Sequence, residues 1–73
     1  MTTNADVARV FERMAVLLEI TGANTFRVRA YVNAARVIAG HGESMASLAG
    51  TPGALEALSG VGKDLAQKIR EIV

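Results

Sequence analysis

The residues with the clearest chemical potential lie in one short run, LSGVGKDLAQKI, which spans residues 58–69. Two glycines flank Val61, and two lysines follow them, Lys63 and Lys68. Glycines between helices leave backbone N–H groups unpaired and accessible, and with the positive end of the next helix dipole these groups form a seat for a phosphate. A lysine adds a charge for that phosphate or, when its amine is neutral, a nucleophile. The run therefore predicts phosphate binding, amine chemistry, or only a tight turn.

Two nucleotide-binding loops can be excluded for this run. A Walker loop requires a glycine where Ala57 stands and a hydroxyl residue where Asp64 stands, and the dinucleotide fingerprint fails because Leu65 replaces its third glycine. What remains is a pattern of two glycines with apolar or small residues at fixed steps from them, namely Leu58, Gly60, Gly62, Ala66 and Ile69. This pattern resembles the helix-hairpin-helix motif, whose hairpin amides hold a nucleic-acid backbone.

A glycine cap between two packed helices, with no ligand, would explain part of this pattern. One glycine is enough for such a cap, whereas this run has two and places Lys63 beside the free amides. Gly60, Val61, Gly62 and Lys63 are therefore predicted to contact DNA phosphates.

The remainder of the chain predicts an all-α fold, a small bundle of four to five short helices. Few aromatic residues, abundant alanine and a single proline favour closely packed helices over a sheet. The expected helices run from Thr3 or Asn4 to Gly22, from Asn24 or Thr25 to Gly40, from Ser44 to Gly50, from Thr51 to about Leu58, and onward from Gly62. The expected apolar positions of the second helix are Phe26, Ala30, Tyr31, Ala34, Ala35 and Ile38.

Length and composition limit the classes of protein that remain. The 73 residues, 51% of them hydrophobic, suffice for a single domain, residues 1–73. The absence of cysteine excludes a disulfide framework and a thiolate metal site, and His41 is the only histidine. No apolar run is long enough to span a membrane, so a cytoplasmic setting is expected. Because the final helix lacks a capping glycine or polar tail, the chain is expected to be part of a longer protein.

The second predicted helix carries the positive charge. Residues 25–42 contain three arginines and no acid, although the net charge of the chain is only +1. Arg27 and Tyr31 lie one turn apart on the apolar side, where an arginine either extends outward to solvent or forms, with the tyrosine hydroxyl, the rim of a phosphate pocket. Arg29 and Arg36 fall on the solvent side and are predicted to be surface charges or non-specific phosphate contacts.

Lys68 falls at the border of the apolar stripe of the last predicted helix. A nucleophilic lysine has to be partly desolvated, since the free amine is almost fully protonated at pH 7. Asp64, one turn earlier, favours the ammonium form. Spacing alone therefore favours a surface ion pair between Asp64 and Lys68 over a catalytic amine.

The segment GANTFRVRAYVNAARVI, residues 22–38, followed by LSGVGKDLAQKI, resembles the amino-terminal domain of family X DNA polymerases, the DNA polymerase beta-like proteins, and especially their bacterial branch. The resemblance covers nearly the whole chain. It implies a small helical domain that binds gapped or nicked DNA at the downstream 5′-phosphate during repair. In some members this domain is also a lyase that removes a 5′-deoxyribose phosphate in base excision repair.

By motif position, the resemblance implies that Lys68 is the Schiff-base lysine, that Tyr31 belongs to the lyase and phosphate pocket, and that Arg27 is a phosphate ligand. It implies no cofactor beyond a Na⁺ or K⁺ ion at the hairpin carbonyls of Ser59 and Val61. The chain departs from lyase-proficient animal members, which have basic residues at the positions of Phe26, Glu56 and Asp64.

Three functions therefore remain open from the sequence. The first is a DNA-binding module, a monomer within a nucleoid-associated bacterial protein that carries its polymerase domain in cis. The second is a 5′-deoxyribose-phosphate lyase acting through Lys68. The third is a helical protein-interaction domain. Polymerase catalysis is not expected from this chain, because it needs a carboxylate-bound metal site on another domain.

Overall fold

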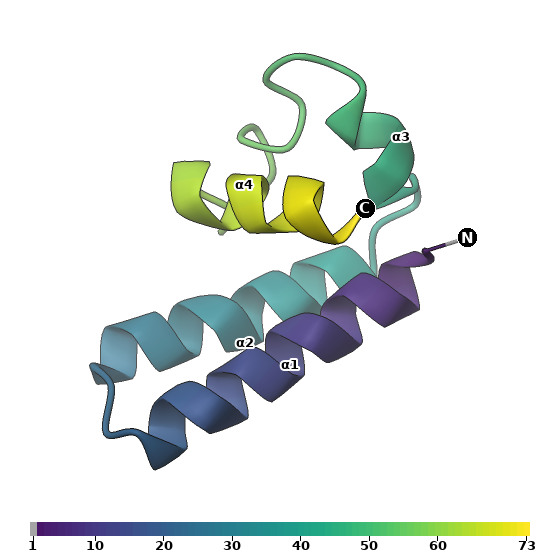
Figure 1. The fold of residues 1–73 in the computed structure, drawn as a ribbon. Coiled ribbons are helices and arrows are strands. Elements are labelled where there is room, and N and C mark those ends of the chain that lie inside the picture. The colour runs from purple at the N-terminus through teal and green to yellow at the C-terminus, as the bar shows by residue number, and fades with distance from the viewer. Residues whose placement is uncertain (1) are drawn as a thin grey trace.

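The computed structural model describes residues 2–73, and the regular structure in that range is entirely helical. The helices are α1 (Asn4–Ile20), α2 (Thr25–Ala39), α3 (Met45–Ala49) and α4 (Lys63–Ile72). Figure 1 shows α1 and α2 as a long antiparallel pair, with α3, the turns that follow it and α4 packed above them. The predicted all-α bundle of short helices is confirmed, with four helices among the described residues.

The first helix begins and ends as its sequence predicts. Thr3 and Asp6 form a capping box: the Asp6 N–H donates to the Thr3 hydroxyl at 3.1 Å, and the Thr3 N–H donates to the Asp6 carboxylate at 3.0 Å. Because this carboxylate accepts the Thr3 N–H, the pKa of Asp6 lies below its usual value. At the other end Gly22 adopts a φ of 76°, which permits the tight reversal into α2.

Asparagine side chains fix both ends of the helical pair. Asn24 caps α2 by accepting a hydrogen bond from the Phe26 N–H at 2.7 Å. Asn4, in the first turn of α1, donates to the Glu43 carbonyl and accepts from the Met45 N–H, both at 2.8 Å. The start of α1 is thereby tied to the start of α3, although the two lie about forty residues apart in the chain.

Residues 51–58 do not form the short helix predicted for them. They make a series of turns in which hydrogen bonds of different spacing alternate: the Ala54 N–H donates to the Thr51 carbonyl, and the Ala57 N–H donates to the Gly53 carbonyl. Gly53 has a φ of 79°, a left-handed conformation that interrupts any helix begun at Pro52. Thr51 therefore begins a series of turns and not a helix. The prediction of a helix from Thr51 to Leu58 is wrong.

This irregular segment is nevertheless fixed to the last helix. Leu55 is fully buried, and Glu56 forms an ion pair with Arg70 of α4 at 2.8 Å. The hydrogen bond from Arg70 holds the pKa of Glu56 below its usual value. The side chains that anchor α4 to the remainder of the fold thus come from the turns as well as from the helices.

A single apolar core lies between the helical pair and the layer above it. Its largest fully buried side chains are Val7, Phe11, Ile38, Met45, Leu55 and Ile69. The rings of Phe11 and Tyr31 contact each other at a tilt, with 5.6 Å between centroids, and this contact joins α1 to α2. None of the helices in residues 2–73 is long and apolar enough to cross a membrane.

Candidate nucleic-acid interface

The turn that precedes α4 is built on Gly60 and Val61. Gly60 has a φ of 79°, so the chain reverses there in a conformation that other residues rarely adopt. The Val61 N–H donates to the Leu58 carbonyl at 3.0 Å, and only 3% of Val61 is exposed. Val61 therefore anchors the hairpin in the core, and of its polar groups only the carbonyl oxygen forms no hydrogen bond within residues 2–73.

The amides at the start of α4 are unpaired. Gly62 is the N-cap of this helix and supplies no side-chain hydrogen bond. The first amide of this turn to find an acceptor within the chain is that of Ala66, which donates to the Gly62 carbonyl at 2.9 Å. Free N–H groups at the positive end of a ten-residue helix form a seat for an anion. Apart from its two chain neighbours, no residue comes within 4 Å of the position that a Cβ on Gly62 would occupy, so the backbone is open on that side.

The hairpin carbonyls could also serve as cation ligands. Those of Ser59 and Val61 accept no hydrogen bond within residues 2–73. Backbone carbonyl oxygens are the kind of ligand that Na⁺ and K⁺ take in proteins. No group of three or more His, Cys, Asp or Glu side chains in the described part of the chain is placed to hold a metal ion.

A pocket of about 150 Å³ lies between α2 and α4, next to the hairpin. Arg27, Ala30 and Tyr31 line it from α2, and Asp64 and Leu65 line it from the first turn of α4. The structure thus brings Arg27 and Tyr31 together at one pocket and adds an acidic wall opposite them.

Tyr31 is a largely buried residue whose hydroxyl lies at this pocket. Only 4% of the residue is exposed, because its ring packs on Phe11. The hydroxyl makes no hydrogen bond, and no side-chain oxygen or nitrogen in residues 2–73 is both buried and unpaired, so the hydroxyl reaches the pocket. Arg27 is exposed on the same side of α2 and forms no ion pair within 4.0 Å with Asp64. The guanidinium and the hydroxyl can therefore both bind a ligand.

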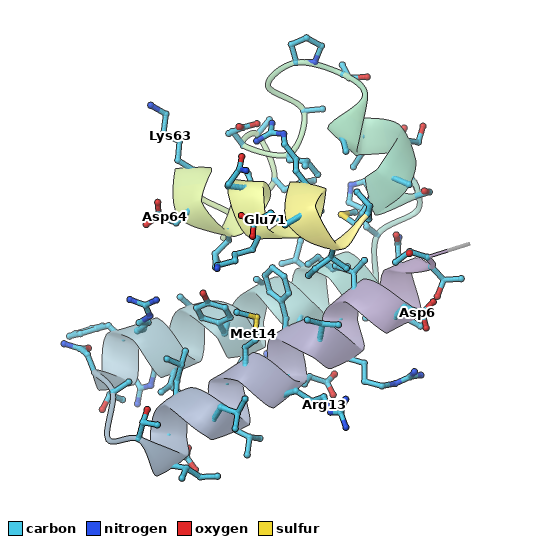
Figure 2. The ribbon with its side chains drawn as sticks, in the orientation of Figure 1. Asp6, Arg13, Met14, Lys63, Asp64 and Glu71 are labelled. Atoms are coloured by element: carbon cyan, nitrogen blue, oxygen red, sulfur yellow. The ribbon has the colours of Figure 1, made fainter. Side chains whose placement is uncertain are left out.

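The two lysines near the hairpin are placed differently. Lys63 is exposed, and Figure 2 shows its side chain leaving α4 away from the α1–α2 pair, whereas Asp64 leaves the same turn in another direction. Lys68 is half-buried and does not line the pocket. The ion pair between Asp64 and Lys68 favoured by spacing is not formed in the described structure. Arg29 and Arg36 are exposed on α2.

The prediction that Phe26 belongs to the apolar face of the second helix is wrong. This residue was expected in the apolar stripe of the second helix, yet 81% of it is exposed. It lies five residues before Tyr31, about 140° around the helix, and this offset was the signal that it points elsewhere. The acidic wall formed by Asp64 was missed as well, because it depends on how α4 packs on α2.

The arrangement defines a class of protein: a small helical domain whose last helix starts at a two-glycine hairpin with free amides. A family model described as helix-hairpin-helix domain matches residues 2–73, and the chain belongs to this family. No curated protein and no solved structure matches the chain. Helix-hairpin-helix domains typically bind DNA, so the family indicates DNA as the partner.

The two hairpin glycines are expected to differ in their effect on stability. Gly60→Ala should lower the free energy of unfolding by about 1–2 kcal/mol, because alanine resists the left-handed conformation. Gly62→Ala should change it by less than about 0.5 kcal/mol, because φ is −88° there. Urea unfolding followed by circular dichroism measures both values. Equal losses would show that the conformation of Gly60 does not govern the hairpin.

Proposed function

We propose that this domain binds DNA without sequence preference, recognises gapped or nicked DNA through its 5′-phosphate, and serves repair synthesis within a family X DNA polymerase. The observation that carries the proposal is the pocket where Arg27 and the unpaired hydroxyl of the buried residue Tyr31 lie beside the first turn of α4. The amides of that same turn are unpaired. One helix start therefore serves two phosphates, one on the hairpin and one in the pocket.

Binding to the DNA backbone has three supports in the structure. The free amides at Gly62 and Lys63 can donate to a phosphodiester, and the Lys63 ammonium adds a charge beside them. Arg29 and Arg36 on the exposed face of α2 add further phosphate contacts. Contacts of this kind read no base edge, so affinity is expected to depend on salt and on DNA geometry rather than on sequence.

Gly62→Val tests the hairpin contact directly. The fold tolerates the side chain, because Gly62 has an ordinary φ and open space at Cβ, but the methyl groups obstruct a phosphate. Affinity for gapped DNA should fall about tenfold or more in fluorescence anisotropy titrations. Gly42→Val is the matched control, because Gly42 also has open space and lies in the loop before α3. Equal affinity of the two variants would contradict hairpin binding.

Arg27 and Arg36 separate recognition of the DNA end from general attraction. Arg27→Ala should weaken binding to a 5′-phosphorylated gap about fivefold or more and leave a 5′-hydroxyl gap almost unchanged, because Arg27 lines the pocket. Arg36→Ala should weaken binding to both gaps equally, since it is an exposed charge outside the pocket. Titration of each variant with both DNAs makes the comparison. If Arg27→Ala lowers the affinity for both gapped DNAs by the same factor, Arg27 acts only as a general surface charge.

Lyase activity is a second candidate, favoured by the half-buried position of Lys68 on α4. The neutral Nζ would attack the C1′ aldehyde of a ring-opened abasic sugar and expel water to form an imine. Loss of a C2′ proton then breaks the C3′–O bond and releases the 3′ phosphate ester, and water hydrolyses the imine to free the lysine. Arg27 and Tyr31 would hold the 5′-phosphate of the sugar during these steps.

Borohydride trapping tests this activity. Reduction of the imine should link the protein covalently to DNA that carries a 5′-deoxyribose phosphate, and Lys68→Ala should remove most of the adduct. Lys63→Ala is the control, because it removes an exposed lysine of the same helix that leaves α4 away from the α1–α2 pair. Adduct formation that survives in Lys68→Ala, measured on a denaturing gel, would exclude Lys68 as the nucleophile.

A protein-interaction role is the third candidate and has its own observation. Val16, Leu17 and Ile20, near the end of α1, are 58%, 60% and 75% exposed. Such a group is typical of a contact with a partner. It lies on a different helix from the hairpin and the pocket, so this role can coexist with DNA binding.

A further inference from the structure

We infer that the pocket binds the 5′-phosphate as its monoanion, with one proton shared between a phosphate oxygen and the carboxylate of Asp64. The inference rests on the proposed function, because it assumes that the 5′-phosphate enters this pocket. It assigns to Asp64 the role of a specificity-determining residue that selects the protonation state of the DNA end.

The pocket is lined by one positively charged residue, Arg27, and one negatively charged residue, Asp64, which do not form an ion pair with each other. Arg27 approaches from α2 and Asp64 from α4, and no ion pair joins them within 4.0 Å. The hydroxyl of Tyr31, a residue that is 96% buried, completes the polar lining. A phosphate bound by Arg27 and Tyr31 would therefore lie in a space of about 150 Å³ that Asp64 also lines.

The protonation state of the 5′-phosphate decides whether its contact with the Asp64 carboxylate is repulsive or attractive. A phosphate monoester loses its second proton with a pKa of about 6, so the dianion predominates at neutral pH. The oxygens of the dianion carry no proton, so they would be repelled by the negatively charged Asp64 carboxylate. The monoanion instead carries an O–H that donates to the carboxylate, which is a strong charge-assisted hydrogen bond, while its other oxygens accept from Arg27 and Tyr31. Binding therefore takes up a proton from solvent.

Other titratable groups near the pocket are few. The charged residues facing the site are Arg27 from α2 and Asp64 from α4, with Lys63 and Lys68 flanking Asp64 on its own helix. Residues of α1 do not line the pocket. His41 follows α2, fourteen residues or about 20 Å beyond Arg27, where its Nδ1 accepts the Glu43 N–H. His41 is therefore expected to act equally on DNA with either end.

The sign of the pH dependence follows from the shared proton. In the native protein the bound phosphate holds its proton more tightly than the free phosphate does, so affinity for the phosphorylated end rises as pH falls from 7.5 toward 5.5. In Asp64→Asn the acceptor of that proton is lost, and the phosphate beside Arg27 and the helix start is most stable as the dianion. Affinity of that variant for the phosphorylated end therefore falls over the same range.

The experiment measures the ratio of affinities for gapped DNA with a 5′-phosphate and with a 5′-hydroxyl, at pH 7.5 and pH 5.5. The ratio should rise about three- to tenfold on acidification in the native chain and should stay level or fall in Asp64→Asn. His41→Gln should behave like the native chain. The ³¹P resonance of the bound 5′-phosphate should titrate above pH 6 with the native chain and below it with Asp64→Asn.

The outcomes separate this inference from the function on which it rests. A preference for the 5′-phosphate that is independent of pH, or a ³¹P titration at or below the value for free DNA, would overturn the shared proton and leave pocket recognition intact. A native chain with no preference for the 5′-phosphate at either pH would overturn both. If the affinity ratio of 5′-phosphate to 5′-hydroxyl DNA still rises on acidification in Asp64→Asn, a group other than Asp64 accounts for the proton taken up on binding. The role assigned to Asp64 would then be overturned.

Discussion

The burial of one face of α4 is the interaction on which the hairpin and the pocket both depend. Leu65, Ala66 and Ile69 fill that face, and Val61 enters the same core immediately before the helix starts. Because these side chains fix the rotation of α4 about its axis, they decide where every other residue of the helix points. Asp64 is turned to the pocket, and Lys68 is left at the border of the core. Apolar packing therefore sets the polar geometry of the candidate site.

The four helices differ in how their first turns are satisfied. Thr3, Asn24 and Ser44 each cap their helix with a side-chain oxygen, whereas Gly62 leaves the first turn of α4 without such a cap. A glycine in this position costs only a few tenths of a kcal/mol relative to a good cap. Among the helices of residues 2–73, α4 is thus the one that begins without a side-chain cap, and in the proposed function a phosphate supplies the missing acceptors.

Features that depend on residues close together in the sequence were predicted correctly, whereas features that depend on contacts between distant segments were not. The starts and ends of α1, α2 and α3 were predictable, because Thr3, Asn24 and Gly22 act within one or two turns. The shared pocket position of Arg27 and Tyr31 required only the helical repeat. Other features depend on tertiary packing or backbone geometry that local preference does not encode. The left-handed turn at Gly53 and the position of Asp64 at the pocket belong to this second group.

The replacement of a helix by turns between residues 51 and 58 has a thermodynamic consequence. This segment lacks the repeated hydrogen bonds that make a helix open cooperatively, and it is retained chiefly by Leu55 and by the ion pair of Glu56 with Arg70. It can therefore open locally while the long α1–α2 pair stays folded. If the hairpin binds a phosphate as proposed, the free energy of this local opening sets the fraction of molecules that are competent to bind, and warming lowers DNA affinity at temperatures where most of the helix content persists.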